Sequence, residues 1–215
     1  EILENFDEKR QKGENESYIC QLIREDSIDE FISYVNRTNM SLSSLISHSI
    51  FETNSFLLSN EKTSLIEYAA FFGSIQIFKY LRINDAKIDS SLLKYAIHSD
   101  NAELIQILEE NNNFIAKEDF DLDCFNEAVK CHNNNITQYF EMNLDPIYKT
   151  DYNVILNSLK SYNFNYIELD SINNGKFFYD LCKYDYPILV EYLTSNDDIN
   201  INDMNIFIMN IYEIF

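Results

Sequence analysis

Three residues that could bind a metal lie close together in the sequence: Cys124, Cys131 and His132. Thiolate and imidazole groups are the usual protein ligands of zinc, and a structural zinc site takes four of them, often with two from a C-x₂₋₄-C pair. The two cysteines are too far apart for such a pair, and no second pair completes the set. We therefore expect ordinary packed side chains here, with no metal and no other cofactor.

Residues for enzymatic chemistry are equally scarce. No histidine falls in the H-E-x-x-H motif, and the chain has no G-x-S-x-G nucleophile motif; the histidines are spread out, at His48, His98 and His132. The three glycines are too far apart to form a phosphate-binding loop. The 36 acidic residues are too numerous for one pair to stand out as general acid and base. The sequence predicts a protein that is not an enzyme, and a hydrolase with carboxylates in a groove is a weaker alternative.

The composition favours a folded, helical protein. Hydrophobic residues make up 46% of the 215 residues and aromatic residues 14%, which is enough for a core. Only 3 glycines and 2 prolines are present, whereas a β-sandwich or barrel needs many turn residues. The four cysteines are scattered, as expected for reduced thiols in a cytoplasmic protein. The sequence therefore predicts an all-α protein in the cytoplasm.

The net charge of −20 limits the classes of partner. A field of this sign repels the phosphates of nucleic acids, and no apolar run approaches the roughly 18 residues of a membrane helix. We expect a protein partner, favoured if its surface is basic, with no nucleic acid and no membrane. The alternative reading of the charge is that it only keeps an apolar molecule soluble.

A repeated pattern of apolar and small residues is the most informative feature. YAAFFGSIQIFKYL, from Tyr68, aligns with YAIHSDNAELIQIL, which begins 27 residues later at Tyr95. Each copy predicts a short apolar helix, a break, and a second helix with apolar residues three and four apart. The predicted break residues mostly tolerate tight turns or cap the next helix: Asp26, Gly73, Asp100, His132 and Asp185.

About six such units divide the chain. We place them near residues 17–35, 63–81, 91–108, 123–140, 152–169 and 176–193, with a partial unit at 203–215. Residues 17–215 are expected to form a single repeat domain, preceded by a polar segment at 1–16. An irregular insert near 36–62 is expected to hold a pair of helices. The apolar segment at 203–215 lacks the polar outer face of a terminal repeat, so we expect further repeats or self-association at that end. Residue 1 is Glu rather than Met, which is typical of a processed or excised fragment.

The unit SLIEYAAFFGSIQIFKYL, from Ser64 to Leu81, resembles the ankyrin consensus T-P-L-H-x-A-A-x-x-G-H-x-x-I-V-x-x-L. The Ala69-Ala70 pair, the turn glycine Gly73 and the Ile77-Phe78 pair occupy matching positions. Glu67 replaces the consensus histidine, so we expect the hydrogen bonds that tie successive loops to be lost. The spacing of 27 residues also leaves little room for a β-hairpin finger. Divergent units of this composition are similar to the expanded ankyrin-repeat families of AT-rich protozoan parasites, in which a domain of unknown function can precede the repeats.

The resemblance implies an ankyrin-like solenoid that binds a protein partner in its concave groove, since tetratricopeptide and HEAT repeats have longer periods. An alternative is the regulatory or substrate-recruiting part of a larger enzyme whose catalytic domain lies outside this chain. By the resemblance, the two residues before each turn face the groove: Phe71, Phe72, His98, Ser99, Lys130, Cys131, Lys183 and Tyr184. We expect at least one of Phe71 and Phe72 to stay exposed and to contact the partner.

Overall fold

One residue with a left-handed backbone separates the two helices of each repeat. Each helix pair can turn there because backbone N–H groups fold back onto the last carbonyls of the first helix: Ser74 N–H donates to the Ala69 carbonyl (2.9 Å) and Gly73 N–H to the Ala70 carbonyl (3.2 Å). All five break residues predicted from the sequence have φ between 48° and 68°: Asp26, Gly73, Asp100, His132 and Asp185. The predicted turn positions are confirmed.

The computed structural model describes residues 5–60, 62–84, 86–88, 91–110, 118–143, 152–167 and 175–195. Nearly all regular structure in these ranges is helical, so the predicted all-α class is confirmed. The chain divides into two compact units, Glu1–Lys117 and Glu118–Phe215, which we describe separately. The single repeat domain over 17–215 stays a prediction, and the partial unit at 203–215 lies outside the described residues.

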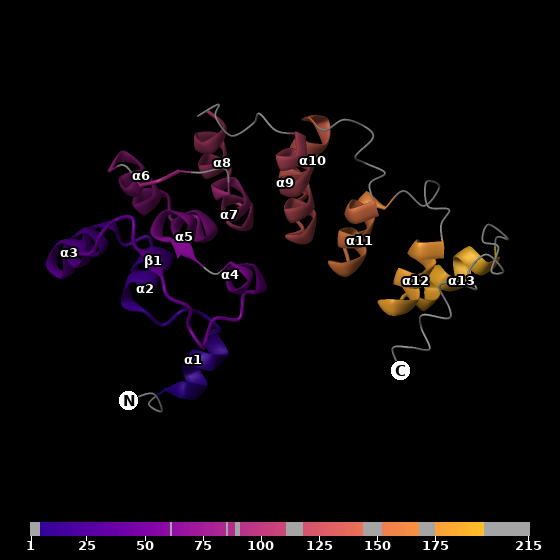
Figure 1. Cartoon of the computed structure of the whole chain (residues 1–215), viewed down its shortest axis with the longest axis horizontal. Coiled ribbons are helices and arrows are strands. Elements are labelled where there is room, and N and C mark those ends of the chain that lie inside the picture. Colours follow the sequence, from indigo (N-terminus) through magenta and orange to yellow (C-terminus); the bar gives the residue numbers. More distant parts are fainter. Residues whose placement is uncertain are drawn as a thin grey trace. The chain divides into compact units, whose positions relative to one another are not determined.

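Unit 1 contains three helix pairs at the predicted repeats (Figure 1). They are α2 (Tyr18–Arg24) with α3 (Ile28–Thr38), α5 (Leu65–Phe72) with α6 (Ile75–Ile83), and α7 (Leu92–His98) with α8 (Ala102–Glu109). The first helices contact one another in the order α2, α5, α7, and the second helices α3 and α6 also touch. Because α5 has a first helix on each side, six of its eight residues are buried.

Small residues allow this close contact between first helices. Ala69 and Ala70 on α5 and Ala96 on α7 are completely buried where the two helices meet. On α6, Phe78 and Leu81 are also 0% exposed and fill the space beneath the helix pair. The core of unit 1 therefore lies along the line of first helices and under the apolar stripe of each second helix.

The insert near 36–62 differs from the expected pair of helices. Beyond the end of α3, its described residues contain one helix, α4 (Ser55–Ser59), and a two-residue strand, β1 (Leu45–Ile46). This strand pairs antiparallel with β2 (Thr63–Ser64), directly before α5. The expectation of a second helix was wrong, because serine and asparagine dominate this stretch and their side chains favour turns over helix interiors.

The polar N-terminal segment is packed against the insert. Its helix α1 (Phe6–Lys12) ends at Gly13, where φ is +65°. The ring of Phe6 meets Phe51 edge-on with centroids 5.4 Å apart, and Thr53 donates from both its backbone N–H and its hydroxyl to the Gly13 carbonyl. The segment therefore helps to anchor the insert.

Unit 2 continues the pattern with one degenerate repeat. Its complete pairs are α9 (Glu118–Lys130) with α10 (Asn134–Asn143), and α12 (Gly175–Lys183) with α13 (Pro187–Ser195). Between them, α11 (Tyr152–Lys160) is followed, in the described residues up to 167, by a 3₁₀ turn, η2 (Phe164–Tyr166), where the sequence predicts the start of a second helix. The first helices contact in the order α9, α11, α12. The turn residue of the degenerate repeat is Tyr162, at φ 58°.

Within each unit, hydrogen bonds tie the turn of a repeat to the turn of the repeat before it. The residue after the left-handed position donates its side chain to a carbonyl near the end of the preceding first helix. In unit 1, Ser74 donates to Ile23 and Asn101 to Gly73. In unit 2, Asn163 donates to Val129 (2.9 Å) and Tyr186 to Leu159 (2.5 Å). The same connection therefore recurs within both units with three different residue types.

Asp26 adds a second tie between the first two repeats. Its carboxylate accepts from the backbone N–H groups of Gln76 and Ile77, both at 3.0 Å, in the first turn of α6. Ser74, the N-cap residue of α6, makes no cap of its own because its hydroxyl donates to Ile23. Asp26 therefore supplies, from the previous repeat, the cap that α6 lacks.

We predict that Asp26→Gly destabilises unit 1. The substitution removes two hydrogen bonds to a carboxylate, about 2 kcal/mol, and regains up to about 1 kcal/mol because glycine adopts the left-handed turn without strain, so the net loss is about 1 kcal/mol. The matched control is Asp185→Gly, because Asp185 is exposed, has φ 59°, and should gain up to about 1 kcal/mol from relief of the left-handed backbone. Urea unfolding of the two variants measures both effects, and equal stabilisation of both would contradict the capping role of Asp26.

Glu67 corrects one expectation from the sequence. Its carboxylate accepts from the backbone N–H (2.8 Å) and hydroxyl (2.7 Å) of Ser64, which closes a capping box at the start of α5. The other oxygen accepts from the Ser91 hydroxyl at 2.8 Å, one repeat later. The expected loss of ties between successive loops was wrong, since Glu67 makes such a tie in place of the consensus histidine.

Candidate functional site

The predicted site residues of unit 1 lie together at the C-terminal ends of α5 and α7. The Phe71 and His98 rings stack with centroids 4.8 Å apart at 27°, and the Phe71 and Phe72 centroids are 4.9 Å apart. Ser99 is half-buried beside His98 and donates its hydroxyl to the Ala96 carbonyl. Residues from two successive repeats thus form one surface, as the alignment of the repeats predicts.

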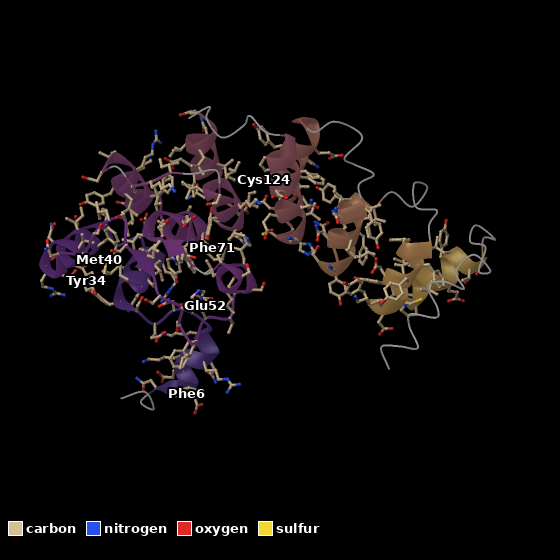
Figure 2. All side chains as sticks on the ribbon, in the orientation of Figure 1. Phe6, Tyr34, Met40, Glu52, Phe71 and Cys124 are labelled. Carbon is tan, nitrogen blue, oxygen red and sulfur yellow. The ribbon has the colours of Figure 1, made fainter. Side chains whose placement is uncertain are left out.

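Phe71, which is labelled in Figure 2, is not open to solvent because the insert covers its ring. Only 8% of Phe71 is exposed, and Phe56 of α4 stacks on its ring at 6.0 Å and 16°. Phe56 also meets the rings of Tyr95 (4.9 Å) and His98 (4.2 Å). The expectation that Phe71 faces an open groove is therefore wrong, because Phe56 covers its ring. Phe56 belongs to the site, although nothing in the sequence of the insert indicated this contact.

Phe72 remains half-buried and opens into a hollow of about 500 Å³ between α1, α2 and α5. We call this the charged hollow. Its floor includes the Phe72 ring, and its walls carry three cations and three carboxylates: Lys9, Lys12, Arg24, Glu14, Glu16 and Glu25, with Gln21. The charges balance locally in a chain whose net charge is −20.

Arg24 fixes the wall of the charged hollow. Its Nη1 donates to the Asn15 carbonyl and to the Tyr68 hydroxyl, both at 2.9 Å, and its Nε lies 3.1 Å from a carboxylate oxygen of Glu14. The guanidinium carbon stands 5.9 Å from the centre of the Phe72 ring. Burial raises the pKa of Tyr68, so this hydroxyl stays protonated and accepts from Arg24. The aromatic floor and its cationic neighbour are therefore held in place before any partner binds.

The predicted site residues of unit 2 form two separate pairs. Lys130 is exposed, with its Nζ 3.0 Å from Glu127, while Cys131 is half-buried and burial raises its pKa to about 12. At the last described repeat, the Nζ atoms of Lys183 and of Lys160 each lie 5.7 Å from the centre of the Tyr184 ring. Lys160 was not predicted, because its repeat is too degenerate to align closely.

Unit 2 also contains an apolar hollow that the sequence did not reveal. It has a volume of about 410 Å³ and is lined by Phe164, Ile167, Asp185, Tyr186, Pro187, Ile188 and Leu189. Ile188 is 79% exposed at its rim. Ile188 directly follows Pro187 at the start of α13, and this position is the sequence signal that could have indicated the hollow.

The cysteines and His132, whose residue types could ligate a metal, lie in different surroundings. None of the four cysteines, which all lie in the described ranges, forms a disulfide; Cys20 and Cys124 are buried, and Cys182 is exposed. The Nε2 atom of His132 lies 2.6 Å from the Ser161 carbonyl of the next repeat. Cys124 and His132 therefore have structural surroundings that differ, one in the core and one at a turn.

Comparison with known proteins adds no relative. No protein-family model matches the chain, and neither a curated protein nor a solved structure shows significant similarity to it. The ankyrin resemblance therefore rests on the residues of the repeats. Among the helices of the described ranges, none combines the length and the apolar character needed to cross a membrane.

Proposed function

We propose that this chain is a non-enzymatic protein-interaction module built from divergent ankyrin-like repeats. Three features support the repeat assignment. Each helix pair has a left-handed turn, the first helices of successive repeats contact one another in sequence order within each compact unit, and hydrogen bonds join successive turns. Repeats that contact only their neighbours form an extended array, and such arrays generally present binding surfaces. A cytoplasmic location is part of this proposal, supported by four cysteines that form no disulfide in the described ranges.

The observation that carries the binding proposal is Phe72 in the charged hollow. Binding hot spots are enriched in aromatic residues and arginine, set where surrounding groups exclude water. Phe72 is half-buried, Arg24 lies over its ring at 5.9 Å, and polar side chains form the rim. We infer that a partner inserts an apolar side chain against Phe72 and pairs its own charges with the rim.

The net charge shapes which partner reaches this site. At −20 the chain attracts basic surfaces over long range, while the charged hollow itself is balanced. A basic protein partner is therefore steered by the whole chain and held by local contacts; nucleic acid and membrane are not part of the proposal. The regulatory part of a larger enzyme is the alternative, and the same surface would then recruit that enzyme's substrate.

We predict that Phe72→Ala weakens partner binding by about 2 kcal/mol, or about thirtyfold. The full chain, immobilised, would capture partners from extracts of cells that express it, with amounts measured by quantitative mass spectrometry over a concentration series. Tyr34→Ala is the matched control. The guanidinium of Arg37 lies at the same 5.9 Å from the Tyr34 ring, but Tyr34 belongs to a hollow along α3 that shares no lining residue with the charged hollow. Equal loss in both variants, or no loss with Phe72→Ala, would contradict the proposed site.

A further inference from the structure

Helix α4 is a single turn that supplies its own caps. The side chain of Asn54 accepts from the N–H groups of Phe56 (3.0 Å) and Leu57 (3.2 Å). At the other end, the side chain of Asn60 donates to the Phe56 carbonyl at 2.7 Å. These bonds lie within residues 54–60, so the turn keeps its polar groups satisfied without help from the rest of unit 1.

The contacts of α4 with the repeats come from few side chains. Phe56 meets Phe71, Tyr95 and His98, and Leu57 is 5% exposed. The next residue, Leu58, is 44% exposed and faces away. The helix therefore lies on unit 1 through two side chains, with the Phe56 ring on the ends of α5 and α7 and Leu57 buried beside it.

Independent contacts hold the chain on both sides of α4. Upstream, Thr53 is bound to the Gly13 carbonyl at 3.0 Å. Downstream, Thr63 belongs to β2 and pairs with Ile46 of β1. These anchors do not involve Phe56, so a release of α4 would leave the rest of the insert attached.

The surface under Phe56 continues into the charged hollow. The Phe71 and Phe72 rings touch, with centroids 4.9 Å apart, so one covered ring and one open ring stand side by side on α5. We propose that Phe71, Tyr95 and His98 form a docking site for an aromatic side chain on a short helical turn of a partner protein, which Phe56 occupies in the free chain. This inference rests on the proposed function and names the chemistry of the partner.

The tether makes the internal ligand hard to displace. A segment joined by a short flexible linker has an effective concentration in the millimolar range. A free peptide of the same sequence therefore competes poorly with α4, whereas a partner that also fills the charged hollow gains the additional contacts needed to replace it. Removal of the Phe56 ring should open the site to the free peptide.

The test uses the chain's own segment as probe. A fluorescent peptide of residues 52–60, ETNSFLLSN, is titrated against the full wild-type chain and against Phe56→Ala, with binding followed by anisotropy. We expect at least about tenfold tighter binding to Phe56→Ala, and loss of that gain when the peptide's own phenylalanine is alanine. Equal affinity for both chains, or for both peptides, would overturn the proposal.

Hydrogen exchange of the wild-type chain gives a second readout in case Phe56→Ala fails to fold. The proposal requires α4 to open locally, so the amides of Leu57 and Leu58 should exchange about a hundredfold faster than those of Ala69 and Ala70 in α5. Exchange at the same rate as α5 would identify α4 as core and overturn the proposal. Neither experiment needs the partner, so their failure would leave the proposed binding at Phe72 to its own test.

Discussion

Replacing Phe78 with alanine should lower the free energy of unfolding by about 3–5 kcal/mol. The side chain is 0% exposed on α6, where that helix packs against both α5 and α3. Its removal leaves a cavity that the neighbouring repeats cannot fill, because the line of first helices is already in close contact. Phe78 is among the largest completely buried side chains of unit 1, so this is one of the largest effects that the packing predicts.

The control for this substitution is Ile83→Ala on the same helix. Ile83 is 79% exposed, so its loss should change stability by less than about 0.5 kcal/mol. Urea unfolding followed by circular dichroism compares the two variants at equal concentration. Similar unfolding midpoints would show that α6 is not packed between repeats as described.

Glu67→Ala should cost about 2–3 kcal/mol. One carboxylate accepts from Ser64 twice and from Ser91 once, and hydrogen bonds to a charged group are individually strong. The substitution therefore removes both the cap of α5 and the tie to the next repeat. Glu67→Gln is the conservative control, since an amide oxygen can still accept one of these bonds, and it should recover at least about half of the loss.

A double-mutant cycle with Ser91→Ala isolates the tie between repeats. If the Glu67 carboxylate bonds Ser91 as the structure shows, the two substitutions should be non-additive by about 1 kcal/mol. Strict additivity would mean that Glu67 acts only as a cap within its own repeat. The measurement thus separates the local role of Glu67 from its role in joining repeats.

The repeat turns could be predicted from the sequence because their chemistry is local. Gly73, three aspartates and one histidine stand at the aligned turn positions. These residue types tolerate the left-handed backbone, and all five residues adopt it. Tyr162 could not be predicted in the same way, since a large aromatic residue with positive φ is uncommon. Its conformation follows from the bonds of the following Asn163 to Ser158 and Val129.

The candidate site was only partly predictable, because some of its contacts join segments that are far apart in the sequence. Alignment of the repeats placed Phe71, Phe72 and His98 at one end of the first helices, where the structure brings them together. The contact of Phe56 with Phe71 joins an irregular insert to a repeat, and no periodicity records such a contact. Arg24 likewise reaches Phe72 through space from the preceding repeat.

Site-specific photo-crosslinking tests the central claim, that a partner protein binds beside Phe72, most directly. A benzoylphenylalanine placed at position 72 of the full chain, in cells that express it, should form a covalent adduct with the partner on irradiation. The same group at position 34, in the smaller hollow along α3, should give little of that adduct. Strong crosslinking to one protein from position 72 alone is the predicted result; equal adducts from both positions, or none from position 72, would contradict the account.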